Sequence, residues 1–286
     1  MTDLRDVLRV RPGDTRLADV DPRSTPGLPE GRAGKHAKQW SRDEVAAISQ
    51  ELAAYQEKLF ASAKEGATTK RVLLLLQAMD CGGKDGTVRA VTQGLSPAGI
   101  KAVSFGPPTD EERSHDFLWR IRRALPGAGY VGVFNRSHYE DVLVVRVHNL
   151  VGEDVWSQRY DLINEFEAEQ AADGLTIVKV MLHISRAEQK ERLLARLDDP
   201  TKHWKYNPGD LTERSLWDEY QQAYEDALNR CSTAAAPWYV VPADRKWYRN
   251  WAVATLLRHA FADIDPQYPQ PDFDVAAERA KLLEAD

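Results

Sequence analysis

Residues 71–87 read RVLLLLQAMDCGGKDGT, and this stretch decides the fold. Arg71–Ala78 is a continuous apolar run, which is typical of a strand buried on both faces of a parallel sheet. The run passes directly into a loop with two glycines and Lys84, and the helical sequence VRAV follows at residues 88–91. A strand, a glycine-rich loop with a lysine, and a helix are the parts of a phosphate-binding loop, in which backbone amides and a helix N-terminus face the anion.

The loop departs twice from the pattern G-x-x-x-x-G-K-[ST], because Ala78 replaces the first glycine and Asp85 replaces the hydroxyl residue. Two carboxylates beside Lys84 would repel phosphate unless a cation lay between them, so we expect Asp80 to hold or orient hydrated Mg²⁺. The same residues are also compatible with a strand-to-helix turn that binds no phosphate, in which Lys84 is solvated, Asp80 is a cap and Asp85 is structural. The candidate phosphate- or nucleotide-binding residues of the loop are Gly82, Gly83, Asp85, Gly86 and Thr87.

Four further apolar runs are candidate strands: Ala102–Phe105, Tyr130–Phe134, Leu175–Ile184 and Trp238–Val241. Helical segments separate them, and this alternation predicts a three-layer α/β fold with a five-stranded, mainly parallel sheet. Capping boxes, in which a hydroxyl and a glutamate satisfy orphan amides, predict three helix starts. They are Ser41–Glu44, Thr109–Glu112 and Ser185–Glu188, and Gly174 stands where a helix should turn into a strand.

Length and composition predict one globular domain, since 286 residues with 43% hydrophobic and 29% charged side chains can bury one sizeable core. No signal-peptide stretch and no run of about 18 apolar residues occurs, so we expect a soluble cytoplasmic protein without a membrane partner. The formal net charge of −6 argues against general nucleic-acid binding, although a polyanion could still occupy a local basic groove. The two cysteines predict neither a disulfide framework nor a metal cluster.

We expect three segments along the chain. Residues 1–40 contain four prolines and no periodicity, which predicts an extended arm on the surface rather than a core element. Residues 41–270 form the phosphate-binding domain, and residues 271–286 form a C-terminal tail. Seven aromatic residues are assigned mainly to packing: Trp204, Trp217, Tyr220, Trp238, Trp247, Tyr248 and Trp251.

A second polar motif follows the candidate strand Tyr130–Phe134, where the chain reads NRSHYEDVL at residues 135–143. In P-loop enzymes a later strand commonly presents a metal-linked carboxylate beside the loop. The segments FNRSHYEDVL and QAMDCGGKDGT together resemble the polyphosphate kinase 2 family, and most closely its class III branch. The resemblance extends from about Ala67 to Pro269 and includes SFGPPTDEE, RLDDPTKHWKYNPGDL, LWDEYQQAYE, APWYVVPAD and KWYRNW.

The resemblance implies a thymidylate-kinase-like P-loop fold with a helical lid at about residues 192–214. It implies Mg²⁺-dependent, reversible transfer of phosphoryl groups from inorganic polyphosphate to nucleotides, with Mn²⁺ as a substitute metal. The class III branch further implies that AMP and ADP both serve as acceptors, and GMP and GDP are further candidates. We also expect the protein to form a homo-oligomer, and the sequence does not give the number of subunits.

The resemblance and the charges together assign site residues. Asn135 is a candidate phosphate- or nucleotide-binding residue at the Walker B position, where other branches have aspartate. Glu140 or Asp141 is therefore expected to supply the missing carboxylate, unless each is a solvated or capping acid. Lys84 and Asp80 are expected to bind phosphate and metal, with Arg136 and Arg196 neutralising transition-state charge. His138 is expected to be packed rather than a base. The expected phosphate-binding lid residues, for which a solvated helix face is the alternative, are Arg192, Lys202 and Lys205.

Two other functions remain open from the sequence. An ATP-dependent nucleoside monophosphate kinase would use the same fold and loop. A polyphosphate-binding regulatory protein without turnover is the third reading, and only the loss of the metal-binding acid at Asn135 supports it. An assay of AMP with polyphosphate and Mg²⁺ separates the first function from these two.

Overall fold

The computed structural model describes residues 3–285, and its centre is a five-stranded sheet. The strands lie in the order β2-β3-β1-β4-β5, and every neighbouring pair is parallel. This arrangement confirms the predicted α/β class and all five predicted strands. The strands are β1 (Arg71–Gln77), β2 (Ile100–Ser104), β3 (Val131–Asn135), β4 (Leu175–His183) and β5 (Trp238–Pro242).

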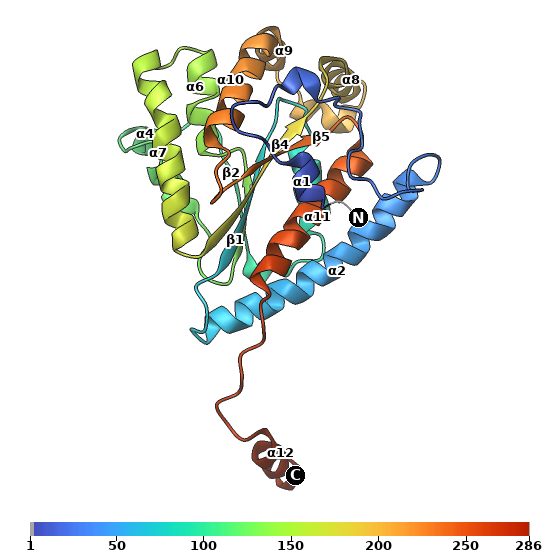
Figure 1. Cartoon of the computed structure of the whole chain (residues 1–286), viewed down its shortest axis with the longest axis vertical. Helices are drawn as coiled ribbons and strands as arrows, with labels where there is room; N and C mark the ends of the chain where they lie inside the picture. The colour runs from blue at the N-terminus through green and yellow to red at the C-terminus, as the bar shows by residue number, and fades with distance from the viewer. Residues whose placement is uncertain (1–2, 286) are drawn as a thin grey trace.

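Helices cover both faces of the sheet and complete the three layers (Figure 1). On one face, α11 (Lys246–Ile264) and α3 (Lys84–Thr92) lie against the sheet, and the long α2 (Ala37–Lys64) packs on the outside of these two helices. On the other face lie α7 (Glu153–Ala172) and α10 (Trp217–Cys231). The other helices are α1 (Leu4–Leu8), α4 (Asp110–Arg113), α5 (Trp119–Ala124), α6 (Val144–Val147), α8 (Arg186–Leu197), α9 (Gly209–Ser215) and α12 (Val275–Glu284). Four 3-10 helices are also present among the described residues: η1 (Leu17–Asp19), η2 (Pro97–Gly99), η3 (His138–Asp141) and η4 (Pro200–Lys205).

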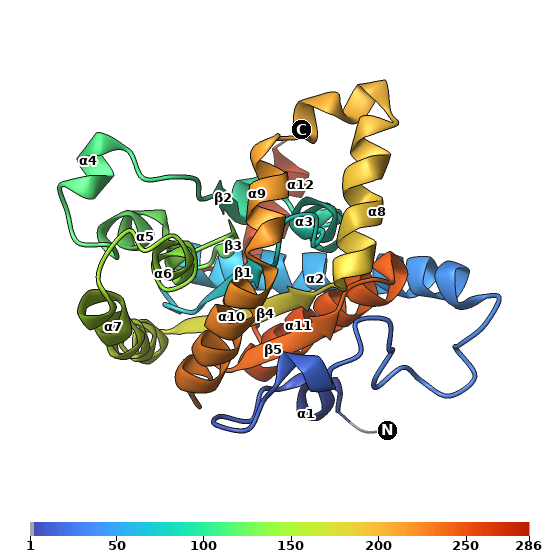
Figure 2. The same cartoon turned by 90° about the horizontal axis from the view of Figure 1, so that it is seen from above.

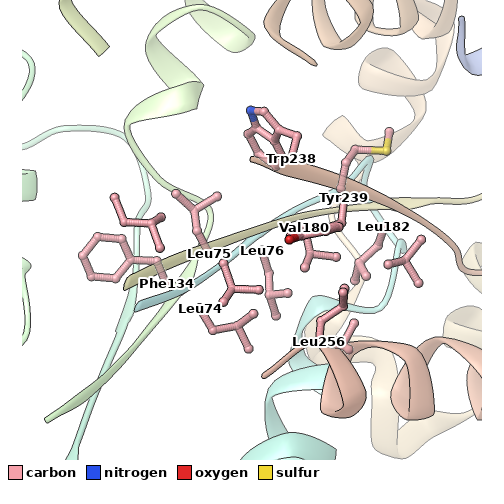
Figure 3. Packing of buried hydrophobic residues seen from close by; sticks show 14 of the residues in the cluster. Leu74, Leu75, Leu76, Phe134, Val180, Leu182, Trp238, Tyr239 and Leu256 are labelled. Atoms are coloured by element: carbon pink, nitrogen blue, oxygen red, sulfur yellow. The ribbon is translucent and has the colours of Figure 1, made fainter. Parts of the chain in front are cut away.

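The core lies around the central strands. All seven residues of β1 are buried, which explains why its sequence is apolar throughout instead of alternating. Figure 3 shows Leu74, Leu75 and Leu76 of this strand packed among side chains of neighbouring strands, with Leu256 of α11 close by. The sheet is therefore a rigid support for the loops at its carboxyl edge.

The strand order places the loop after β1 at the topological switch point. The chain leaves β1 for β2 and β3 on one side, and later crosses to β4 and β5 on the other. Ligands of open α/β sheets bind in the crevice outside the carboxyl ends of strands at such a point. The loop of residues 78–83 opens into this crevice.

The N-terminal segment differs from the surface arm that we predicted. Leu4, Leu8 and Leu17 are buried in the core. The amide of Val10 donates to the carbonyl of Trp238 at 2.9 Å, so the segment also covers the outer edge of β5. The prediction was wrong because α1 is a short helix whose two leucines recur at i and i+4, a pattern too brief to recognise beside the prolines.

The predicted capping boxes have three different outcomes. The box at Thr109 is confirmed in full. Ser185 accepts from the amide of Glu188 as expected, but the Glu188 carboxylate pairs with Arg192. The box at Ser41 is wrong, because α2 already begins at Ala37 and the Ser41 hydroxyl donates to the carbonyl of Trp247 at 2.7 Å, a tertiary contact with α11.

The C-terminal segment lies apart from the sheet. Figure 1 shows α12 beyond an extended connection, away from the body of the molecule, and no residue of α12 is buried. Among residues 3–285, no helix is both long enough and apolar enough to span a bilayer.

Candidate active site

The phosphate-binding loop is a tight turn that depends on glycine. The amide of Gly82 donates to the carbonyl of Met79 at 2.9 Å, and Gly83 has φ of 100°, in the left-handed region that favours glycine. A Cβ added to Gly82 would lie 2.4 Å from the Cβ of Ala78. Alanine at the usual first-glycine position is therefore tolerated because residue 82 has no side chain.

Two non-glycine residues with left-handed backbone frame the site. Cys81 in the loop has φ of 63°, and Arg136 directly after β3 has φ of 65°. Such conformations cost of order 1–3 kcal/mol and persist only when the surrounding structure holds them, often at functional sites. Burial raises the pKa of the Cys81 thiol, so Cys81 is a loop-forming residue rather than a ready nucleophile.

Lys84 is the first residue of α3, and its Nζ donates to the carbonyl of Ala78 at 2.9 Å. This contact folds the lysine back over its own loop, with its charge at the helix N-terminus. The pKa of Lys84 is lowered, mainly by burial and next by the nearby Arg136 guanidinium. Its charge is thus incompletely compensated by protein groups, and an anionic phosphate would stabilise it.

Arg136 links the two carboxylates predicted for the metal. Its Nη2 lies 3.0 Å from Oδ1 of Asp80, and its Nη1 lies 3.2 Å from Oε2 of Glu140. Burial alone would lower the pKa of Arg136, but Glu140 and then Asp80 outweigh it, and the pKa is raised. The loop after β1 and the loop after β3 are therefore joined at one charged cluster.

The donor set of this cluster fits Mg²⁺ held together with substrate. Among the described residues, no group of three or more His, Cys, Asp and Glu side chains could hold a metal alone. Mg²⁺ usually binds through one or two carboxylates while substrate phosphates and water complete its shell. Asp80 and Glu140 supply that number of carboxylates at the mouth of the loop.

A cleft of about 630 Å³ lies over the loop, and we call it the basic cleft. Its lining includes two carboxylates, Asp80 and Asp85, against nine basic side chains. Such an excess of one charge in a concave site attracts a polyanion. The basic side chains come from α3, the residue after β3, the lid and α11: Lys84, Arg89, Arg136, Arg192, Arg196, Lys202, Lys205, Lys246 and Arg249.

The segment predicted to be the lid, about residues 192–214, comprises the second half of α8, all of η4 and most of α9, and we keep the name lid for it. Figure 2 shows α8 rising from the body to the η4 turn, from which the chain returns along α9 into α10. Lys205 of η4 reaches Asp85 at 3.6 Å, and Nη1 of Arg196 contacts the carbonyl of Lys205 at 2.8 Å and Oδ2 of Asp210 at 3.2 Å. Lys205 thus contacts the first turn of α3, and Arg196 joins η4 to α9. Lys202 also lines the basic cleft, and its ammonium pairs with Asp199.

A smaller pocket of about 320 Å³ adjoins the basic cleft, and we call it the side pocket. Both cavities are lined by Asp80 and Arg136, so they meet at the charged cluster. Tyr220 and Tyr224 of α10 form part of its wall. Burial and then the Glu140 carboxylate raise the pKa of Tyr224 well above its ordinary value, so its hydroxyl stays neutral. A partly apolar wall with a few polar groups is typical of a small-ligand site.

Other predicted residues have structural contacts. The Thr87 hydroxyl is buried and donates to the carbonyl of Gly83, beneath the loop rather than in the cleft. Asn135 donates to Oδ1 of Asp85 at 2.8 Å. Asp141 accepts from Arg159 at 3.0 Å, which favours the structural alternative for this acid.

Two further predicted residues are also engaged by protein groups. The guanidinium of Arg192 donates to the carbonyls of Cys81 and Ala243 at 2.8 and 2.7 Å, and so fastens the loop to the end of β5. His138 is buried against Glu167, packed as expected.

The sequence analysis missed Arg249. This α11 residue is only 3% exposed, its Nε and Nη2 contact the side chain of its neighbour Asn250, and Nη1 points at Gly83. Burial and then the nearby Arg192 lower its pKa to about 10. A buried arginine is usually paired, and among the described residues no carboxylate lies within 4.0 Å of Arg249, so its guanidinium is available to an anion in the cleft. Its only sequence signal was its place within KWYRNW, beside Lys246, which also lines the cleft.

Trp204 corrects the assignment of the aromatic residues to packing. It is 79% exposed at the tip of the lid, and the Lys205 ammonium lies 4.9 Å from its ring. The prediction was wrong because η4 projects from the body and offers no core to pack against (Figure 2). Five of the other six aromatic residues are buried, and Trp247 is half-buried.

The family model for polyphosphate kinase 2 (PPK2) matches residues 35–269. The chain belongs to this family. It is 48% identical to the AMP/ADP-polyphosphate phosphotransferase of Meiothermus ruber, covering 92% of this chain and 95% of that protein. It is 38% identical to the ADP-polyphosphate phosphotransferase of Rhodopseudomonas palustris, covering 96% and 95%. The crystal structure of polyphosphate kinase 2 from Arthrobacter aurescens TC1 superposes with a TM-score of 0.94 at 51% identity, covering 99% of this chain and 98% of that one. The α/β fold is thus that of a PPK2 enzyme.

Proposed function

We propose that this polyphosphate kinase 2 family member transfers the terminal phosphoryl group of inorganic polyphosphate to nucleoside mono- and diphosphates. The observation that carries the proposal is the meeting of two unlike cavities at Asp80 and Arg136. The basic cleft suits a donor that is negatively charged along its whole length. The side pocket, with about 320 Å³ and two tyrosines, suits a nucleotide better than a polyanion.

The reaction needs positioning and charge neutralisation more than covalent chemistry from the protein. A phosphate oxygen of the acceptor in the side pocket attacks the terminal phosphorus of the donor chain. A new P–O bond forms, the P–O bond to the next phosphate unit breaks, and the shortened chain leaves with the electron pair. Phosphate oxygens of the acceptor are largely ionised near neutral pH, so no side chain has to remove a proton.

Each charged residue has a place in this scheme. Lys84 and the loop amides bind the donor phosphates, and Arg136 lies where cleft and pocket meet, so it neutralises charge on the phosphoryl group in transit. Arg196 of the lid also lines the basic cleft and contributes a second positive charge to the phosphoryl group in transit. Lys202 and Lys205 bind phosphate units farther along the donor.

Mg²⁺ is the proposed metal, with Mn²⁺ as a substitute, and Asp80 with Glu140 would hold it. When bound, the cation neutralises phosphate charge and orients the phosphoryl group. Arg136 forms ion pairs with both carboxylates and so offsets their repulsion before substrate arrives.

The proposed acceptor range of this protein rests on the names of its relatives. The Meiothermus ruber relative is named for both AMP and ADP, and the Rhodopseudomonas palustris relative for ADP alone. The higher identity to the former supports both acceptors for this chain, and GMP and GDP are included as candidates.

The test compares donors and acceptors in one assay. Purified protein receives AMP or ADP with either polyphosphate or ATP, with Mg²⁺ or excess chelator, and products are separated by chromatography. We expect polyphosphate and Mg²⁺ to give ADP from AMP and ATP from ADP. Phosphorylation of AMP by ATP alone would instead assign an ATP-dependent kinase, and formation of only one product would assign a narrower acceptor range.

A further inference from the structure

A third cavity, of about 760 Å³, adjoins the basic cleft outside the site described above. It lies between the first turns of α2 and the start of α11, and Lys246 lines both cavities. We call it the outer groove and define it by its basic residues, Arg23, Lys38, Arg42, Arg245 and Lys246. Neither the proposed transfer step nor the predicted lid uses it.

The cations of the outer groove are not neutralised by the protein. Within the described residues, none of the five forms an ion pair with a carboxylate within 4.0 Å. The one carboxylate in the lining, Asp244, is buried, and its two oxygens accept from the amide and hydroxyl of Ser185, each at 2.9 Å. Five cations without a carboxylate partner in one groove produce a strong positive potential there, although the formal net charge of the chain is −6.

The outer groove adjoins the basic cleft along α3. Gly86 lines the cleft, while Ala90 and Gln93 line the groove. Gln93 is the C-cap of α3 and keeps a helical backbone, so spacings of four and three residues place all three on one stripe. Lys246 stands at the junction, and its pKa is lowered by burial and then by Arg192 and Arg249, both of which line the cleft. Positive charge therefore extends from the loop past Lys246 into the groove.

We propose that the outer groove binds phosphate units of the donor chain remote from the reacting end, so that long polyphosphate occupies cleft and groove together. This inference rests on the proposed function and adds a subsite to it. A donor too short to leave the cleft gains nothing from the groove. The groove therefore makes this protein prefer long chains, and it acts on donor binding rather than on the chemical step.

The test neutralises two groove residues that do not line the basic cleft, Lys38 and Arg42, which are exposed on α2. The double variant is Lys38→Gln/Arg42→Gln. The matched control is Lys64→Gln/Lys70→Gln, which removes the same charge from exposed positions at and beyond the other end of α2. Dissociation constants are measured by calorimetry for tripolyphosphate and for polyphosphate of about one hundred units, and KM and kcat with AMP are measured for both donors.

For the groove variant we expect the dissociation constant and KM of the long chain to rise about threefold to tenfold, because exposed charge contacts are individually modest. The values for tripolyphosphate and kcat should stay unchanged, and the salt dependence of long-chain binding should become shallower. An equal loss for both chain lengths, an equal loss in the control, no loss at all, or tighter binding of single-stranded nucleic acid than of polyphosphate would overturn the inference. Absence of turnover in the wild type would refute the proposed function, while the binding data would still test the groove.

Discussion

Gly83 and Arg249 share one small volume at the floor of the basic cleft. A Cβ added to Gly83 would lie 1.8 Å from Nη1 of Arg249, far inside any real contact distance. The two residues are separated by 166 positions in sequence, and α11 brings the guanidinium against the loop. The glycine therefore has two functions, since it permits the positive φ of 100° and leaves room for a buried cation.

Gly83→Ala should remove most phosphoryl transfer. The methyl group strains the backbone and displaces Arg249 or the loop, and misplacement of reacting groups by about 1 Å can cost about 10²-fold in rate. Steady-state kinetics with polyphosphate and AMP measure the loss. Gly66→Ala is the control, because Gly66 also has positive φ, of 71°, but faces open space. It should lose stability without losing activity, and equal losses of activity in both variants would contradict the steric account.

Arg249→Met should separate stability from donor binding. A buried cation without a carboxylate destabilises the free protein, so its replacement by an apolar side chain of similar length should raise the midpoint of thermal unfolding. The same change should reduce the stabilisation that polyphosphate gives, because a charge-assisted contact worth about 1.5–3 kcal/mol is lost.

Arg258→Met on the same helix is the control, since Arg258 is partly exposed near Glu44 and Glu51. It should leave the polyphosphate-induced stabilisation unchanged. If Arg249→Met instead lowers the unfolding midpoint and preserves the full effect of polyphosphate, Arg249 is a structural residue and not part of the donor site.

Lys84→Met should change how the free energy of unfolding depends on pH. The pKa of Lys84 in the fold is lowered by burial and by Arg136 from its ordinary 10.5. The protonated lysine thus destabilises the fold at neutral pH, and this cost disappears as pH rises through the lowered pKa towards 10.5. The variant should be more stable than the wild type at pH 7, with a difference that shrinks as pH increases. Urea unfolding at several pH values measures it, and a difference that grows with pH would contradict this pKa assignment.

The lid lysines should affect donor binding, and Arg196 should affect the rate. Lys202→Gln/Lys205→Gln removes contacts to remote phosphate units, so KM for long polyphosphate should rise with kcat little changed. Arg196→Gln should also lower kcat, because a charge complementary to the transition state acts there. Raised ionic strength should weaken donor binding more in the wild type than in the double lysine variant. Equal salt sensitivity with an unchanged KM would identify the lysines as a solvated surface.

The sheet and the loop were predictable because their signals are local. The run Arg71–Ala78 needs only its own apolarity to indicate a buried strand, and the glycines with Lys84 need only their order to indicate a phosphate loop. Arg249 and the leucines of α1 were missed because their roles come from contacts with residues far away in sequence. Ser41 was misread for the same reason, since α11 takes the hydroxyl that would otherwise cap a helix.

The charged cluster was predictable only in part. The charges of the loop pointed to Asp80, and the resemblance to polyphosphate kinase 2 pointed to Arg136 and Glu140. The ion pairs among these residues depend on the register that places the ends of β1 and β3 side by side. The sequence also left Asp141 open as a metal ligand. Its pairing with Arg159 of α7 is a tertiary contact that no local pattern encodes.

Phosphorus NMR of one ATP-free mixture tests the central claim most directly. The wild type, Lys84→Ala and Asp80→Ala each receive polyphosphate, AMP and Mg²⁺, and circular dichroism verifies that all three are folded. The account predicts that the wild type converts AMP to ADP and then ATP, with an equal loss of phosphoanhydride from polyphosphate, while both variants lose nearly all turnover. No conversion by the wild type, or conversion that survives in either variant, would contradict it.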